Sequence, residues 1–325
     1  MIRSFIIILS VLVVFSCAEE TRNYKNGGSV FGTSYGIIYH SDQDYHEEFK
    51  MIFDTINQSL STYIQDSDIS KINRNESVPI DHHFRRVYKA SLQIYNETNG
   101  VFDPTIGAVV NAWDFGPEGR IESLDSTKIA ELMNSVGYDK VFLKDSVITK
   151  PEAAFLDFNA IAKGYAVDAI GEFLETKNID DYLVEIGGEI RTRGVNPERN
   201  SGWLVGIDKP NFDGTQSIFS KVSLGNSAMA TSGTYRKFKT DSLGNRFAHI
   251  IDTKTGYPSK TNILSVSVIA ETCMEADAYA TALQAMGVEE VRRFLQSKPE
   301  VKVLLIVENS DKELEAININ SFPEE

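Results

Sequence analysis

An aspartate and a threonine four residues apart are the side chains whose types and spacing most suggest chemistry. Asp277 and Thr281 fall in a stretch that predicts a helix over residues 275–286, so their oxygens would share one helix face. Alanines alternate with them over residues 276–282 and let another backbone approach closely. A carboxylate, a hydroxyl and a backbone carbonyl would form the hard oxygen site that Mg²⁺ accepts together with a substrate phosphate. The structural alternative is an aspartate favoured by the helix dipole and a threonine bonded back to the preceding turn.

A lysine at the start of a predicted helix marks a second candidate site. Residues 154–158 predict a strand ending at Asp157, and the chain then turns at residues 159–160 into a helix over 161–176. The first turn of a helix has free N–H groups that bind anions and disfavour a cation. Lys163 therefore indicates either a ligand's negative charge or a surface lysine without a role. Asp157 is either a neighbour of the helix cap or a polar contact for a buried heterocycle.

Weaker signals come from two aromatic residues, one histidine and two glycine-containing pairs. Trp113 and Tyr63 lie in polar loops, which suits either stacking on a planar ligand or capping of the core. His249 is either a general acid or base or a structural residue. The pairs at 187–188 and 232–233 allow close approach to a phosphate and also form turns. The sequence has no dinucleotide fingerprint, P-loop, hydrolase elbow or zinc-type Cys/His spacing.

A mixed set of helices and strands must position these segments. Amphipathic periodicity predicts helices over residues 49–60, 82–97, 161–176, 275–286 and 288–297. Strands are expected over residues 30–40, 140–143, 147–149, 154–158, 182–186, 203–208, 220–224, 247–251, 263–269 and 302–307. Helices and strands do not alternate strictly, which predicts an α+β fold, and no long linker divides the chain.

The N-terminal residues are typical of a targeting signal. Arg3 precedes an apolar run over residues 5–15, which is short for a membrane span and has the size of a signal-peptide core. Cys17 follows a small residue at the end of this run, as in a bacterial lipobox. We therefore expect residues 1–16 to be a lipoprotein signal peptide and Cys17 to carry lipid. An ordinary cleaved signal with an incidental cysteine is the alternative.

The rest of the chain divides simply. The polar residues 17–29 are expected to be a lipid-anchored tether, and residues 30–325 a single folded domain. If Cys17 carries lipid, Cys273 has no partner and no disulfide framework exists.

The composition excludes several classes of protein. The chain has 325 residues, of which 42% are hydrophobic and 24% charged, values typical of a globular protein. Its 32 Lys and Arg against 46 Asp and Glu give a net charge of −14 without a basic run. Such a chain is a poor binder of nucleic acid or anionic lipid. A phosphate compound would have to be held locally, by backbone amides, a metal or a few cations.

In their order along the chain, these segments resemble the ApbE family of flavin transferases. The most specific motifs are residues 159–168 (NAIAKGYAVD), 185–189 (EIGGE), 230–233 (ATSG) and 275–278 (EADA). The resemblance runs from about Phe31 to about Ile306. It implies a T-fold-like body of mixed, mainly antiparallel sheets with packed helices, in a membrane-anchored bacterial lipoprotein that faces the periplasm.

The resemblance also implies a reaction. A Mg²⁺-dependent transferase would cleave the pyrophosphate of its substrate FAD, pass FMN as a phosphoester to a Thr or Ser of an acceptor protein, and release AMP. The acceptors it implies are subunits of Na⁺-translocating quinone reductase and of Rnf complexes.

Site residues follow from the resemblance by position. Asp277, Thr281 and the carbonyl of Ala160 would hold the metal, and His249 would assist proton transfer. The residues that would contact FAD are Phe31, Tyr63, Ala112, Trp113, Asp114, Asp157, Lys163 and the backbone of Ile251.

Two departures from the family pattern leave other functions open. Phe31 stands where the family often has Met, and Thr234 stands where it often has Asp after Thr-Ser-Gly. If that Asp helps to deprotonate the acceptor hydroxyl, Thr234 weakens the case for transfer. A Mg²⁺-dependent FAD pyrophosphatase, which would use water, and a flavin-binding lipoprotein without catalysis are the alternatives.

Overall fold

The computed structural model describes residues 21–119, 121, 124–235, 238–240 and 246–323. The predicted signal peptide and the lipidation site at Cys17 lie outside these residues. Within the described ranges, no helix combines the length and apolar character that crossing a membrane requires.

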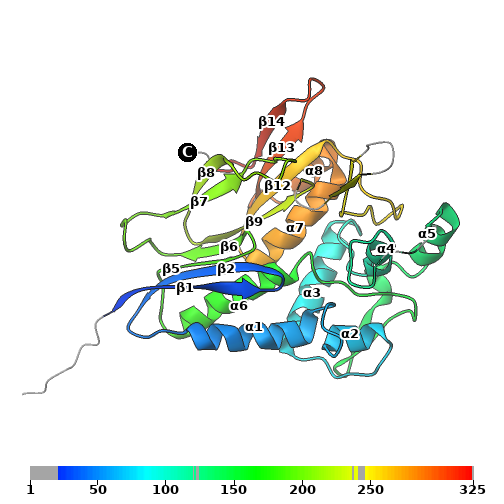
Figure 1. Cartoon of the computed structure of the whole chain (residues 1–325), viewed down its shortest axis with the longest axis horizontal. Helices are drawn as coiled ribbons and strands as arrows, with labels where there is room; N and C mark the ends of the chain where they lie inside the picture. The colour runs from blue at the N-terminus through cyan, green and yellow to red at the C-terminus, as the bar shows by residue number, and fades with distance from the viewer. Residues whose placement is uncertain (1–20, 120, 122–123, 236–237, 241–245, 324–325) are drawn as a thin grey trace, which may run out of the picture.

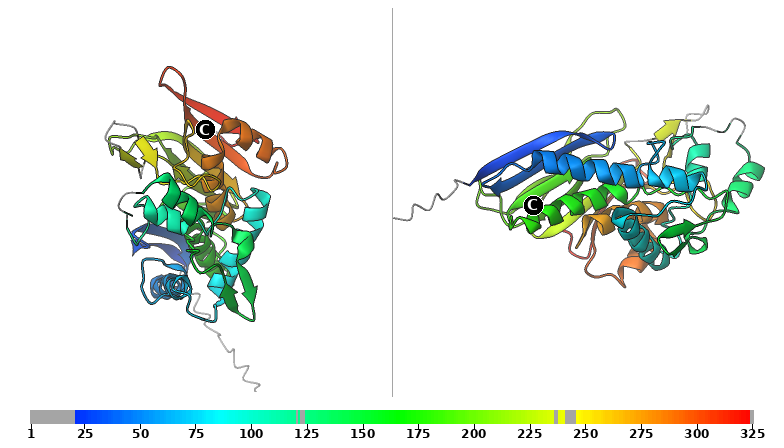
Figure 2. Two further views of the ribbon diagram at one scale, coloured as in Figure 1. Left: turned by 90° about the vertical axis from the view of Figure 1, so that its right-hand side faces the viewer. Right: turned by 90° about the horizontal axis from the view of Figure 1, so that it is seen from below.

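An eight-stranded antiparallel sheet forms the centre of the fold, in the order β1-β2-β5-β6-β9-β12-β13-β14 (Figure 1). Its strands are β1 (Arg22–Val30), β2 (Thr33–Ser41), β5 (Tyr182–Ile186), β6 (Glu189–Arg193), β9 (Ser227–Gly233), β12 (Ile263–Ala270), β13 (Lys302–Glu308) and β14 (Leu314–Ile319). The left view of Figure 2 places α1 (His46–Leu60) near the bottom of the molecule and the β13–β14 hairpin at the top.

Helices cover one face of the sheet. The remaining helices are α2 (Asp68–Asn73), α3 (His82–Glu97), α4 (Gly107–Ala112), α5 (Ser126–Met133), the 3₁₀ helix η1 (Tyr138–Lys140), α6 (Ala162–Thr176), α7 (Cys273–Met286) and α8 (Val288–Leu295). Helix α6 contacts β5 and β6, and α7 contacts β9 and β12. Three short hairpins complete the fold: β3 (Phe142–Lys144) with β4 (Val147–Thr149), β7 (Trp203–Asp208) with β8 (Ile218–Leu224), and β10 (Phe238–Thr240) with β11 (Arg246–Ala248).

The two faces of the sheet have separate cores, because side chains alternate along each strand. In β12, Val266 and Val268 pack into the large core shared with the helices, whereas Ile269 packs into a smaller core. That smaller core also contains Val205 of β7 and Val222 of β8. The β7–β8 hairpin therefore covers the face of the sheet opposite the helices.

Most of the predicted elements are confirmed, and the structure corrects three. The tether predicted over residues 17–29 is wrong from Arg22 onward, because β1 begins there and pairs with β2 along its whole length. The strand predicted over 154–158 is reduced to a single bridge between Phe155 and Ile106. The strand predicted over 247–251 ends at Ala248.

Close packing of α6 against α7 depends on a glycine. A Cβ atom on Gly164 would lie 2.3 Å from the Cys273 carbonyl oxygen, a backbone atom that cannot move aside cheaply. We therefore expect Gly164→Ala to lower the free energy of unfolding by about 3 kcal/mol, in spite of the better helix propensity of alanine.

Denaturant unfolding tests this expectation. Gly225→Ala is the matched control, since a Cβ atom there meets nothing within 4 Å, and it should change stability by less than ~0.5 kcal/mol. Equal effects of the two substitutions would contradict the close-packing argument.

Candidate active site

A cavity of about 560 Å³ opens where several strands end against α7. Its walls come from the β1–β2 turn, the segment 101–115 around α4, the loop before α6, the β5–β6 turn, the end of β9, the segment after β11, and α7. Most of the residues assigned by resemblance line it: Phe31, Asp157, Ala160, Lys163, His249, Ile251, Asp277 and Thr281. The fold thus gathers residues from distant parts of the sequence into one site.

Asp277 is a buried carboxylate that does not cap its helix. Thr272 caps α7, and its hydroxyl accepts the Glu275 N–H. Asp277 is the fifth residue of α7 and lies beyond the first turn, where the helix dipole favours an aspartate most. The Gly164 N–H donates to Oδ2 of Asp277 over 3.0 Å. Burial raises the pKa of Asp277, with the Lys163 ammonium opposing the rise. A buried carboxylate of this kind is stabilised by a cation.

The Thr281 hydroxyl lies one turn further along the same helix. Thr55, Thr98 and Thr176 each donate their hydroxyl to a carbonyl of the preceding turn. Among the described residues, Thr281 makes no such bond, although it also lies on a helix and lines the cavity. Its oxygen is therefore available to a ligand, and the donor set of Asp277, Thr281 and Ala160 fits Mg²⁺.

An ion pair connects the start of α6 to the start of β6. The Lys163 ammonium lies 2.5 Å from Oε1 of Glu189, which is 3% exposed. Oε2 of Glu189 is buried and has no hydrogen-bond partner within the described part of the chain. Lys163 also lines the cavity, so it is not a surface lysine without a role. Lys163 thus contacts one buried carboxylate, Glu189, and interacts with a second, Asp277. This arrangement favours a phosphate-bearing ligand with a metal ion.

Glu189 should make the stability of the metal-free protein depend on pH. Burial raises the pKa of Glu189 from 4.5 to about 7, and Lys163 opposes this rise. The unfolded chain releases this proton near pH 4.5 and the folded chain near pH 7, so the free energy of unfolding falls as pH rises between these values. We expect this to amount to roughly 1–3 kcal/mol.

Comparison with Glu189→Gln isolates this effect, because glutamine does not titrate. In EDTA, the melting temperature of the wild type should fall relative to that of the variant between pH 5 and 7. A raised pKa for Glu189 would be excluded if the difference between the two melting temperatures stayed constant. It would also be excluded if the wild type became more stable relative to the variant as the pH rose.

Two further cavity residues have defined neighbours. Asp157 accepts the N–H of Asn159 over 2.7 Å, which closes the turn before α6. The His249 ring lies beside the ring of Phe115, with their centroids 6.3 Å apart. Both line the cavity, so each combines a local structural contact with access to a ligand.

Comparison with known proteins identifies the family. The model of the ApbE family matches residues 31–305. The chain belongs to the ApbE family. It is 36% identical to the FAD:protein FMN transferase of Haemophilus influenzae over 324 residues, covering 94% of this chain and 93% of the relative. The residues matched by the family model, 31–305, agree with the extent of the resemblance given by the motifs, about Phe31 to about Ile306.

Solved structures of ApbE proteins share the fold. The flavin transferase ApbE from Vibrio cholerae aligns with a TM-score of 0.82 and 31% identity, covering 93% of this chain and 99% of that one. The apo flavinyl transferase ApbE from Pseudomonas stutzeri aligns with a TM-score of 0.83 and 28% identity, covering 93% of this chain and 96% of that one. The predicted α+β body with mainly antiparallel strands is confirmed.

Four residues that the ApbE resemblance assigns to FAD do not line the cavity: Tyr63, Ala112, Trp113 and Asp114. Tyr63 is 61% exposed, and Ala112 is buried in α4. The Trp113 indole N–H donates to the Gly256 carbonyl over 2.9 Å. The Asp114 carboxylate pairs with Lys239. Their contact with FAD stays a prediction.

Two residues that sequence reasoning missed do line the cavity. Phe115, two residues after Trp113, lines the cavity, and the Lys239 ammonium lies 5.1 Å from its ring centre. Glu189 is the last residue of the ApbE motif at residues 185–189. A carboxylate directly after a glycine pair was the feature of the sequence that could have marked it as a site residue. Thr234, in contrast, does not line the cavity, and its hydroxyl donates to the Leu264 carbonyl over 3.3 Å.

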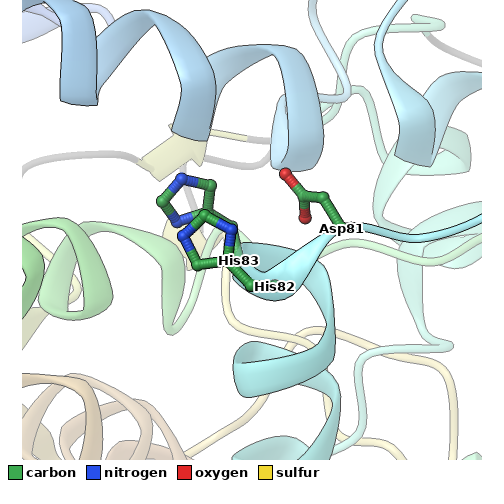
Figure 3. A group of neighbouring side chains, drawn as sticks. All are labelled: Asp81, His82 and His83. Atoms are coloured by element: carbon green, nitrogen blue, oxygen red, sulfur yellow. The ribbon is translucent and has the colours of Figure 1, made fainter.

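Asp81, His82 and His83 form a second group of possible metal ligands, at the start of α3 (Figure 3). Both ring nitrogens of His83 are already bonded, to the Tyr165 hydroxyl at 2.6 Å and the Thr55 hydroxyl at 3.2 Å. Asp81 accepts the Phe84 N–H as the cap of α3. The group therefore holds α3 in place and has few free donors for a cation.

Proposed function

We propose that this protein transfers FMN from FAD to a threonine or serine hydroxyl of an acceptor protein and releases AMP. Membership of the ApbE family and the similarity to FAD:protein FMN transferases support this function. The observation that carries the proposal is the convergence of Asp277, Thr281 and Ala160 beside Lys163 in one cavity. This set combines oxygen donors for Mg²⁺ with a cation for phosphate.

Each part of the cavity has a separate task in the proposed reaction. Asp277, Thr281 and the Ala160 carbonyl would hold Mg²⁺, which would neutralise charge on the pyrophosphate. Lys163 would contact a phosphate oxygen, and its pairing with Glu189 holds the ammonium in place. Phe31 and Phe115 line the cavity and provide apolar surface for the flavin rings.

The proposed transfer needs one general base, which accepts the proton of the acceptor hydroxyl. The acceptor oxygen forms a bond to the FMN phosphorus while the bond from that phosphorus to the bridging oxygen breaks. AMP leaves with the bonding electrons, and the hydroxyl proton passes to an imidazole nitrogen of His249. Positioning and charge neutralisation then carry most of the rate, as in other phosphoryl-type transfers.

A transfer assay tests the function. The form lacking residues 1–17 is mixed with FAD, Mg²⁺ and a flavin-acceptor domain, and the acceptor is weighed by mass spectrometry. A gain of one FMN that is lost in EDTA is the expected result. An unlabelled acceptor with intact FAD would contradict the proposal.

FAD pyrophosphatase activity is the second candidate, and Thr234 is the observation that favours it. Threonine has no carboxylate, and the Thr234 hydroxyl donates to the Leu264 carbonyl outside the cavity, so this position supplies no base to the acceptor. FMN and AMP that accumulate beside an unlabelled acceptor would establish this activity instead.

The partner and location that we propose follow the same reasoning. The acceptors are subunits of the Na⁺-translocating quinone reductase or Rnf type, and the protein is a lipoprotein anchored through Cys17 that faces the periplasm. Mass spectrometry of the membrane-extracted protein tests the anchor, since a diacylglycerol on Cys17 should be found.

A further inference from the structure

A second hollow, also of about 560 Å³, adjoins the active-site cavity. We call it the hairpin groove: it lies between residues 206–216 of the β7–β8 hairpin and the β5–β6 turn with β2 and β9. Met229 and Ile190 line it, and both belong to the core on the hairpin side of the sheet. The active-site cavity is instead bounded by α7 on the helical side.

The hairpin groove and the active-site cavity meet at three residues. Thr33, Gly187 and Thr231 line both. Gly187 belongs to the β5–β6 turn that leads into Glu189. Glu189 contacts Lys163, whose neighbour Gly164 donates its N–H to Asp277. The junction therefore lies close to the groups that would bind the pyrophosphate.

The walls of the two hollows differ in chemistry. Three phenylalanines, Phe31, Phe102 and Phe115, line the active-site cavity. They provide the apolar aromatic surface on which the ring system of a flavin can pack. The hairpin groove has Tyr235 as its one aromatic residue among the described residues that line it, and most other side chains there are polar. Four glycines, Gly187, Gly188, Gly206 and Gly214, carry no side chain and leave room in the groove. An open groove lined by polar side chains suits an extended polypeptide, whose main-chain N–H and C=O groups those side chains can bond.

We propose that the hairpin groove binds the acceptor segment as an extended chain, with its threonine or serine pointing past Thr33, Gly187 and Thr231 to the FMN phosphorus. FAD would enter the active-site cavity, and the acceptor would approach from the opposite face of the sheet. This inference rests on the proposed transferase function. It assigns acceptor recognition to a surface separate from the FAD site.

Filling the groove tests the inference. Gly206 lines the groove on β7, and the three atoms nearest to a Cβ placed there belong to the Ile218 side chain, at an ordinary contact distance of 3.6 Å or more. In Gly206→Trp we expect the KM for a purified acceptor domain of a Na⁺-translocating quinone reductase subunit to rise at least tenfold. The Kd for FAD, measured by flavin fluorescence, should stay within twofold of the wild type.

Leu204→Trp is the matched control, because Leu204 lies two residues earlier on the same exposed face of β7 and outside the groove. Gln216→Trp is a second groove variant, in an exposed loop, and keeps the test valid if Gly206→Trp does not fold. An unchanged acceptor KM in folded groove variants would overturn the inference. A loss of FAD affinity with unchanged acceptor KM would also overturn it and assign the groove to the adenosine half of FAD. A wild-type protein that labels no acceptor would instead refute the transferase function itself, and the inference with it.

Discussion

Asp277→Ala should reduce FMN transfer by about 10³-fold or more. Asp277 is the one carboxylate in the proposed metal set, and it is buried against the start of α6. Removing it leaves one hydroxyl and one carbonyl, too few donors to hold Mg²⁺ from water. A loss of this size corresponds to roughly 4 kcal/mol of transition-state stabilisation.

A binding measurement distinguishes this loss from a folding defect. Saturating Mg²⁺ should raise the melting temperature of the wild type and leave that of Asp277→Ala unchanged, because a ligand stabilises only the state that binds it. Glu275→Gln is the matched control: it lies on the same helix, outside the cavity, and glutamine preserves the helix cap. Turnover of Asp277→Ala near the wild-type rate would refute the metal assignment.

His249→Ala should slow transfer by about 10²–10⁴-fold, the range that a general base contributes. His249 lines the cavity beside Phe115 and is the one histidine among the described residues that line it. Since its task is to accept the hydroxyl proton, the substitution should lower kcat and leave the Kd for FAD within threefold.

Chemical rescue separates a proton acceptor from a merely structural ring. Added imidazole should restore part of the transfer rate of His249→Ala. The exposed His82, changed to alanine, serves as the control and should transfer at the wild-type rate with or without imidazole. A rate for His249→Ala within threefold of the wild type would exclude the role of base.

Local periodicity explains why much of the fold was predictable. The helix predicted over residues 82–97 matches α3 at both ends, and its Asp81 cap and apolar spacing are features of the sequence itself. Strand β1 was missed for a related reason. Most of its side chains are exposed, and backbone pairing with β2 holds it in place, so it leaves no pattern of buried residues to detect.

For the site, too, the sequence was informative where residues are close together in the chain. Asp277 and Thr281 share a helix face because of their four-residue spacing, and the structure places both in the cavity. In contrast, the pairing of Lys163 with Glu189 joins a helix start to a strand start, and no local pattern encodes it. Phe115 lines the cavity and Trp113 does not, while the Trp113 indole N–H donates to the carbonyl of Gly256, 143 residues away in the chain.

The sequence by itself thus determined the family, the main helices and the side chains that carry the proposed chemistry. Only the tertiary structure decided which of these side chains meet, which carboxylate is buried beside the lysine, and where a second groove joins the cavity. The physical reason is that backbone periodicity and helix caps are set by neighbours in sequence. Cavities and buried ion pairs, in contrast, arise where strand ends and helices from distant segments pack together.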